Sequence, residues 1–253
     1  MRDLYIRWME LPEPVPRDSY LAQLPVVKYL AEKKIEFHKQ VTFFVGENGS
    51  GKSTLIEALA VALGFNPEGG SRNFNFSTKD THSELCDYIR VARGVIRHRT
   101  GFFLRAESYY NFASNLEKLD EDDPGDYSDK PLIFQYGFQS MHKQSHGESF
   151  LALVENRFYQ NGLYILDEPE AALSPRGIIR LMQNINRLVR QNCQFIIATH
   201  SPMLLCFPDA EVYQITEKGI DSVRFQDTDH YRTTVRFLQN PESAAEEILG
   251  RGE

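Results

Sequence analysis

The stretch that decides the fold is VTFFVGENGSGKST, residues 41–54. Its first part, Val41 to Val45, is a short apolar run of β-formers that ends at Gly46, which is typical of a buried parallel strand. Its last part begins a run of strong helix formers, Ser53 to Leu63, and Gly64 follows as a C-terminal stop signal. The glycine-rich segment therefore lies between a predicted strand and a predicted helix, which is the context of a phosphate-binding loop.

The residue types of this loop suit a polyphosphate. Glycines let backbone N–H groups turn toward phosphate oxygens, and the helix that follows directs its positive end there. Lys52 adds a mobile positive charge, and Ser53 offers a hydroxyl ligand for Mg²⁺. We therefore predict that ATP and Mg²⁺ bind at Gly46, Glu47, Asn48, Gly49, Ser50, Gly51, Lys52, Ser53 and Thr54.

Two strand ends further along the chain carry side chains that match such a site. Leu163 to Leu166 is an apolar predicted strand, and Asp167 and Glu168 follow it directly. We predict that Asp167 holds Mg²⁺ and that Glu168 polarises the attacking water. Carboxylates also end many ordinary strands, so this interpretation depends on the phosphate loop upstream.

The second strand end is at Phe195 to Ala198, which leads to His200. A lone histidine at a strand end is more often structural than catalytic. Beside a phosphate loop and a pair of carboxylates, however, His200 is predicted to bond the γ-phosphate and to help orient the water next to Glu168.

Strands that alternate with helices predict an α/β fold with a mainly parallel sheet flanked by helices. The remaining elements that we expect are an edge strand over Tyr5–Leu11, a short helix over Val26–Lys33, a helix over His82–Ala92, a strand over Phe102–Leu104 with a helical stretch to Leu119, a helix that begins at Ser174-Pro175, a hairpin over Val212–Gln226 and a C-terminal helix from Asn240-Pro241 to near Gly250.

The composition argues against several classes of protein. The 253 residues are 42% hydrophobic and 25% charged, which is ordinary for a globular chain. No apolar stretch approaches the roughly 20 residues of a membrane span, and no secretion signal is visible, so we expect a cytoplasmic protein without membrane contact. Three cysteines at irregular spacing (Cys86, Cys193 and Cys206) are expected to be reduced thiols.

Charge bears on nucleic acid as a partner. The net charge of −7 argues against a dedicated duplex-DNA binder, because neutralising phosphates needs a basic surface. A basic cluster is nevertheless present (Arg90, Arg93, Arg97, His98 and Arg99), and we interpret it as a solvated helix face and turn. The acidic run 120–123 precedes Pro124-Gly125 and is expected to be an exposed loop.

With these motifs in place, the sequence resembles the ABC-type ATPases, and among them the soluble heads of the SMC, RecF and OLD kind. More narrowly it is similar to the small bacterial "AAA family ATPases". The matching residues are 46–54, 103–108, 166–170 and 199–202. The resemblance implies one ABC-type ATPase domain over 1–253, with a variable helical and antiparallel β subregion inserted at 66–150, and ATP hydrolysis as its activity.

The resemblance also directs attention to Gln144–Ser149, where this class has its signature motif. Ser145 and Gly147 match the motif, whereas His146 and Glu148 depart from it. In the family this helix end contacts the γ-phosphate bound to a second subunit, so a head-to-tail homodimer is implied. Taken alone, the segment is a polar helix start in which Ser145 and Glu148 fit a capping box. Glu107 stands near the place of the family's loop glutamine, with a plain surface charge as the alternative.

Four biological roles remain open from the sequence. The first is an ATP-driven dimerisation switch. The second is a transporter ATPase subunit, which the altered signature and the 170–175 segment disfavour. The third is a DNA-repair or chromosome-maintenance head, and the fourth is a regulatory subunit that holds or silences an effector partner such as a nuclease or toxin.

Overall fold

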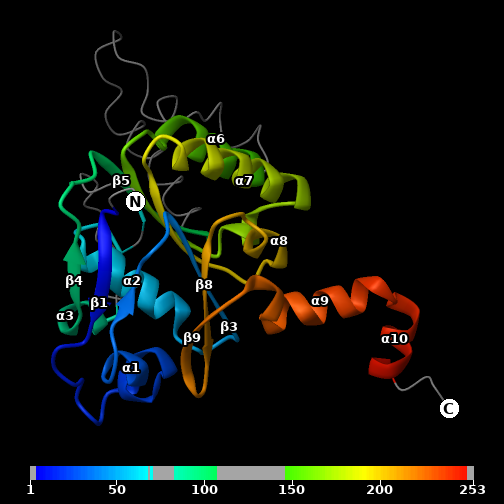
Figure 1. The fold of residues 1–253 in the computed structure, drawn as a ribbon, viewed down its shortest axis with the longest axis horizontal. Helices are drawn as coiled ribbons and strands as arrows, with labels where there is room; N and C mark the ends of the chain where they lie inside the picture. Colours follow the sequence, from blue (N-terminus) through cyan, green and yellow to red (C-terminus); the bar gives the residue numbers. More distant parts are fainter. Residues whose placement is uncertain (1–3, 68, 71–82, 107–145, 250–253) are drawn as a thin grey trace, which may run out of the picture.

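A computed structural model describes residues 4–67, 69–70, 83–106 and 146–249 (Figure 1). Within these residues the larger sheet has six strands in the order β5-β6-β7-β3-β8-β9. All neighbours from β5 to β8 are parallel, and only β9 runs antiparallel. The predicted parallel α/β sheet is therefore confirmed, with these bounds: β3 Val41–Gly46, β5 Thr100–Arg105, β6 Gly162–Asp167, β7 Gln194–Ala198, β8 Glu211–Thr216 and β9 Gly219–Val223.

A smaller antiparallel sheet lies beside the first, with β1 (Ile6–Glu10) between β2 (Ile35–Glu36) and β4 (Arg90–Arg93). The strand predicted near the N-terminus is confirmed as β1, but its predicted edge position was wrong, because β1 is the central strand of this sheet. The helix expected over His82–Ala92 was wrong, because only Leu85–Tyr88 (α3) is helical and β4 pairs with β1. The β-branched residues Ile89 and Val91 suit a strand, and the open edge of β1 offers backbone partners that local helix propensity cannot match.

The basic cluster consequently begins on a strand rather than on a helix. Arg90 and Arg93 are exposed on β4, and Arg97 and Arg99 are exposed in the turn that follows. The expectation of a solvated surface is confirmed for these four arginines but not for His98, which is partly buried and stacks on Phe65, and the expectation of a helix face was wrong.

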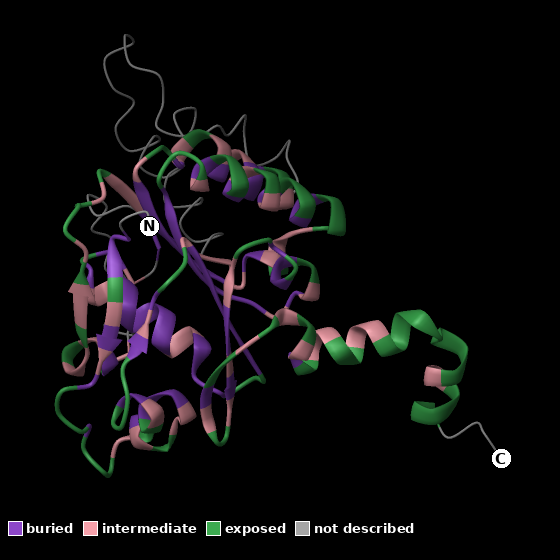
Figure 2. Cartoon of the chain, viewed as in Figure 1, coloured by how far each residue is buried: buried purple, intermediate pink, exposed green. Residues whose placement is uncertain are grey.

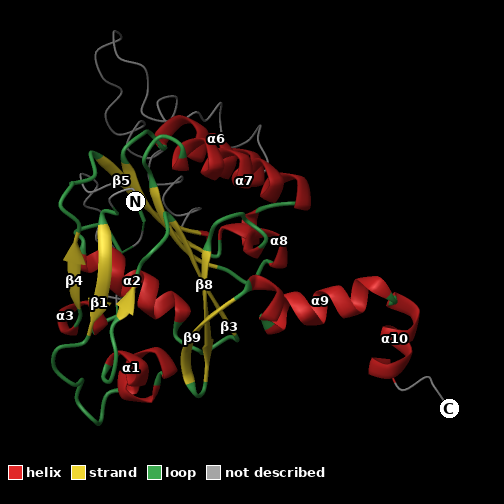
Figure 3. Ribbon diagram, viewed as in Figure 1, coloured by secondary structure: helices red, strands yellow, loops and turns green. Residues whose placement is uncertain are grey.

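The helices divide between the two faces of the larger sheet (Figure 3). The phosphate-loop helix α2 lies between the two sheets, whereas α6 and α7 cover the opposite face. The bounds are α1 Pro25–Leu30, α2 Lys52–Ala62, α6 His146–Arg157, α7 Pro175–Val189, α8 Pro202–Leu205, α9 Asp229–Gln239 and α10 Pro241–Leu249, with 3₁₀ turns at Tyr20–Gln23, Pro169–Ala172 and Phe225–Asp227.

The central strands are buried along their length (Figure 2), and successive side chains of each strand point to opposite faces of the sheet. Phe44 points toward α2 and the smaller sheet, and Phe43 points toward α6 and α7. Both side chains are 0% exposed, so truncating either to Ala would cost about 3–5 kcal/mol of stability. The fully buried runs in β3, β6 and β7 are what fix the strand ends on which the site is built.

The predicted helix at Ser174-Pro175 is confirmed as α7. The Ser174 hydroxyl accepts a hydrogen bond from the backbone N–H of Gly177 at 3.2 Å, which caps the helix. Its predicted apolar face packs on the sheet, with Ile178, Leu181, Ile185 and Leu188 buried and Met182 and Val189 partly buried.

The C-terminal region adds one helix that the sequence pattern did not predict. The hairpin is confirmed as β8–β9, and the helix after Asn240 is confirmed as α10. Between them lies α9, which begins at the Thr228 cap, where the hydroxyl accepts from Tyr231 N at 3.3 Å. Figure 1 shows α9 and α10 extending away from the sheets.

The structure also bears on the expectations about the cysteines and about membrane-spanning segments. Cys86, Cys193 and Cys206 are free thiols, and Cys193 is buried next to β7. In the part of the chain that the structure describes, every helix is too short or too polar to cross a bilayer. The helical stretch expected up to Leu119 lies outside the described residues.

Candidate functional site

The phosphate loop connects β3 to α2, as predicted. Gly49 and Gly51 have φ values of 81° and 93°, which residues other than glycine rarely adopt. A Cβ on Gly51 would also lie 2.7 Å from a methyl group of Val26. Glycine is therefore required at 51 both for backbone conformation and for space, and the loop forms the tight turn that a phosphate cradle needs.

Lys52 is buried within this turn. Its Nζ donates to the carbonyl oxygens of Gly46 at 2.8 Å and Glu47 at 3.2 Å. Burial lowers the pKa of the Lys52 ammonium, and the nearby carboxylates of Glu168 and Asp167 oppose that shift. The lysine thus holds the loop closed on itself through two backbone carbonyl oxygens.

Asp167 meets the loop where β6 ends. Its Oδ1 accepts a hydrogen bond from the Ser53 hydroxyl at 3.1 Å, and the residue is 3% exposed. Burial raises the pKa of the Asp167 carboxyl to about 6, against the opposing effects of Arg105 and Ser53. The structure brings the two predicted metal ligands together, and two oxygen donors are the kind of ligand that Mg²⁺ prefers.

Arg105 is a neighbour that the sequence reasoning did not identify. Its Nε lies 3.1 Å from the Asp167 Oδ2, and its Nη1 lies 2.8 Å from Glu57 of α2. The parallel register of β5 and β6 sets Arg105 directly opposite Asp167. No sequence signal gives this pairing, because it depends on which strands become neighbours.

Glu168 and His200 also come together. The Glu168 Oε1 and the His200 Nε2 are 3.2 Å apart. Glu168 has left-handed backbone angles (φ 49°, ψ 51°), and its N–H donates to the carbonyl of Ala198 at the end of β7 at 3.0 Å. This conformation turns the carboxylate out of the strand toward the histidine, although it costs a non-glycine residue roughly 1–3 kcal/mol.

Glu170 fixes the segment that carries His200. One of its carboxylate oxygens, Oε1, accepts from the Thr199 hydroxyl at 2.8 Å, from the His200 N–H and from the Ser201 N–H at 3.1 Å. Charge-assisted hydrogen bonds of this kind are the strong ones in proteins. Glu170 was part of the quoted motif, but nothing in the sequence indicated that it would orient the histidine.

His230 is a second residue that sequence reasoning missed. It lies in the first turn of α9, and its Nε2 is 3.0 Å from the Nδ1 of His200. Burial is the main cause that lowers its pKa, followed by the charge of His200. The helix start at Thr228-Asp229 was a signal that could have revealed α9, but not the contact between two histidines 30 residues apart.

An open cleft of about 750 Å³ runs beside the loop. Its floor is the loop itself, its walls come from the start of α1 and from β8, and His230 stands at its edge. It is lined by Gln23, Pro25, Lys28, Gly46, Glu47, Asn48, Gly49, Ser50, Gln214, Ile215, Thr216, Glu217, Asp229 and His230. Residues 46–50 of the loop line this cleft, whereas Lys52, Ser53 and Asp167 are not among its lining residues. The loop glycines, the lysine and the oxygen pair of Ser53 and Asp167 nevertheless have the chemistry that fits a Mg²⁺-bound polyphosphate. Thr54 follows on the first turn of α2 and is half-buried.

The signature-like segment lies elsewhere. Gly147, at the start of α6, lines a different pocket together with Ala172 and Leu173, and the two pockets share no lining residue. A Cβ on Gly147 would lie 2.7 Å from the Ala172 carbonyl, so the glycine also allows α6 to pack closely on that turn. Ser145 and Glu107 lie outside the described residues.

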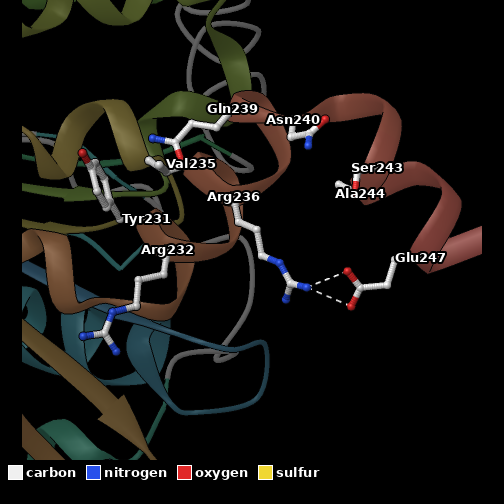
Figure 4. A pocket seen from close by; sticks show the side chains of 9 residues that line it. All are labelled: Tyr231, Arg232, Val235, Arg236, Gln239, Asn240, Ser243, Ala244 and Glu247. Carbon is white, nitrogen blue, oxygen red and sulfur yellow. Dashed lines mark hydrogen bonds and ion pairs between the residues drawn. The ribbon is translucent and has the colours of Figure 1, made fainter.

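A further hollow, of about 460 Å³, lies between α9 and α10 (Figure 4). Arg236 crosses it to pair with Glu247 at 2.6 Å, and Tyr231, Val235 and Ala244 line it. None of the predicted site residues reaches it, so it is separate from the phosphate loop.

Comparisons with known proteins show which sequence families the chain resembles. Residues 26–136 match a sequence family described as "AAA domain", and residues 149–205 match one described as "AAA domain, putative AbiEii toxin, Type IV TA system". The chain is 28% identical over 178 residues to an uncharacterised ABC transporter ATP-binding protein of Haemophilus influenzae, an alignment that covers 66% of each chain, just under two thirds of that relative's length.

Two other similarities are informative. Over 58 residues, 23% of this chain, the identity to the DNA double-strand break repair Rad50 ATPase of Methanocaldococcus jannaschii is 38%, which covers 5% of that protein. The crystal structure of a nucleotide-free ATP-binding cassette from an ABC transporter superposes with a TM-score of 0.51, covering 94% of this chain and 98% of that one at 17% identity. This second similarity shows the fold. Together with the loop and the strand ends, the two family matches and the similarity to the Haemophilus protein support an ABC-type P-loop ATPase.

Proposed function

We propose that this ATPase binds ATP with Mg²⁺ at the phosphate loop and hydrolyses it with Glu168 and His200. The observation that carries the proposal is the meeting of two pairs at the ends of β6 and β7: Ser53 with Asp167 at 3.1 Å, and Glu168 with His200 at 3.2 Å. Each pair joins segments more than 30 residues apart in sequence, and both stand beside the loop that holds Lys52.

Each side chain then has one task. Ser53 and Asp167 hold Mg²⁺, which neutralises charge on the phosphate oxygens when it is bound. Lys52 exchanges its two carbonyl contacts for phosphate oxygens. Glu168 accepts the hydrogen bond of the attacking water on the side of the γ-phosphate, and His200 donates from Nε2 to a γ-phosphate oxygen. Positioning and charge neutralisation supply the acceleration, since phosphoryl transfer needs little other help.

We further propose that two copies of the chain join head to tail around two ATP molecules. Support comes from the place of Gly147, which lines a pocket separate from the phosphate loop of its own chain. A second copy would bring the start of its α6, with Ser145 and Gly147, to the open side of the cleft. The chain would then act as one ATPase domain over 1–253, with 66–150 as an insertion, in the cytoplasm and without a membrane partner.

We propose the biological role of this ATP-driven dimer from the descriptions of the matched families. The description of the match at 149–205 names a toxin of a toxin–antitoxin system, which favours a regulatory role toward an effector partner. The Haemophilus relative is named as a transporter subunit and the archaeal one as a repair ATPase. We place the effector role first, because the toxin family match covers the segment with the Asp167, Glu168 and His200 motifs.

The test is a pair of variants in one assay. Glu168→Gln should retain ATP and Mg²⁺ but lose turnover by about 100-fold or more, the size expected for a general base. Glu13→Gln, the same change in an exposed loop, should behave as wild type. Equal turnover in wild type and Glu168→Gln would remove Glu168 from the reaction.

The dimer has a separate test. The ATPase rate per subunit should rise with protein concentration, and Glu168→Gln with ATP should elute as a dimer in size-exclusion chromatography. A rate independent of concentration, with a persistent monomer, would contradict the head-to-tail arrangement and leave the nucleotide site intact.

A further inference from the structure

We propose that His230 is a positioning residue that fixes the tautomer of His200, so that the N–H of His200 always faces Glu168 and the γ-phosphate. The inference rests on the proposed function of His200 and extends it to α9, a helix outside all the motifs of the site. Its basis is the 3.0 Å contact between the His200 Nδ1 and the His230 Nε2.

The direction of the hydrogen bond follows from what lies on the other side of His200. The second ring nitrogen, Nε2, is buried and lies 3.2 Å from a carboxylate oxygen of Glu168, although the two atoms are not aligned as a hydrogen bond. A neutral imidazole has one N–H and one lone pair. If Nδ1 carried the proton, the lone pair of Nε2 would face a negative oxygen, which is repulsive. Nε2 therefore carries the proton, and Nδ1 accepts from the Nε2–H of His230.

The surroundings of His230 favour its neutral form, which has one N–H to donate. Burial lowers its pKa, the charge of His200 lowers it further, and Glu47, Lys52 and Asp229 act with smaller effects in alternating directions. His230 is therefore neutral near pH 7 and has one N–H to donate.

The contact between His230 and His200 also connects α9 to the proposed catalytic residues. His230 stands in the first turn of α9, which packs near α8 just after the His200 segment and carries α10 beyond it (Figure 1). Gln214 of β8 donates to Asp229 at 2.9 Å and secures that first turn. A displacement of α9 would withdraw the donor from His200 and would also move Asp229 and His230 in the wall of the cleft beside the phosphate loop.

The experiment compares His230→Phe, which keeps a ring but no nitrogen, with His230→Gln, which restores an N–H donor. We expect His230→Phe to lower kcat about tenfold while ATP affinity changes less than about twofold. His230→Gln should recover most of the rate, and His38→Phe, at an exposed histidine, should match wild type.

A second readout does not depend on turnover. In protein labelled with ¹⁵N in its histidine rings, neutral His200 should show the Nε2–H tautomer in wild type and a mixture in His230→Phe. A wild-type Nδ1–H tautomer, an unchanged His200 tautomer in His230→Phe, or a large loss of ATP affinity would overturn the inference. If Glu168→Gln is inactive while His230→Phe is fully active, only this inference fails. If Glu168→Gln is fully active, the proposed function fails instead.

Discussion

Replacing Asp167 by Asn should make the nucleotide-free protein more stable at pH 8. Asp167 is 3% exposed, and burial raises its pKa from 3.8 to about 6 even though Arg105 and Ser53 contact it. A folded-state pKa above the unfolded one means that the folded chain binds the proton more tightly. This stabilisation is complete below pH 3.8 and is lost as the pH rises through about 6.

The magnitude follows from the two pKa values. Each unit of difference is about 1.4 kcal/mol, so an ionised Asp167 costs the fold about 3 kcal/mol at pH 8 relative to its protonated form. Asn has the shape of the protonated carboxyl and can still accept from Arg105. Asp167→Asn should therefore gain up to about 3 kcal/mol at pH 8 and much less at pH 4.

The assay is urea unfolding with EDTA and without nucleotide, at both pH values. Asp221→Asn makes the same chemical change at an exposed position of β9 and should leave stability within about 0.5 kcal/mol. A variant Asp167→Asn that is less stable than wild type at pH 8 would refute the reasoning. It would show that the ion pair with Arg105 outweighs the burial of the charge.

Three further outcomes follow from the site. Lys52→Ala should weaken ATP binding by at least about tenfold, measured by titration calorimetry, and unchanged affinity would count against the loop assignment. Glu170→Gln keeps an acceptor but loses its charge, so it should cost about 1–2 kcal/mol in urea unfolding and lower kcat, whereas an intact rate would show that His200 needs no anchor. A Cβ on Gly46 would lie 2.6 Å from the Ile215 carbonyl, so Gly46→Ala should cost about 1–3 kcal/mol, with Glu13→Gln as the neutral comparison. An unchanged melting temperature for Gly46→Ala would contradict the packing of β3 on β8.

Much of the site could be predicted because its signals are local. The loop between a strand and a helix, and the carboxylates after Leu166, are visible in a single segment of sequence. The parallel sheet then had to bring those strand ends together. Arg105 and His230 could not be predicted, because their contacts depend on which strands become neighbours and on where a late helix begins. The helix expected over His82–Ala92 failed for a similar reason, since β1 offered a partner edge that no local window reveals.

Glu168 has one further consequence, for how this protein would change under laboratory selection. Its left-handed backbone angles suit glycine better than glutamate, and the buried charge next to it at Asp167 also disfavours the folded state. A library screened only for yield or heat resistance should therefore accumulate Gly at 168 and Asn at 167. Such winners would be well-folded proteins without turnover, so any screen of this chain needs activity as a second criterion.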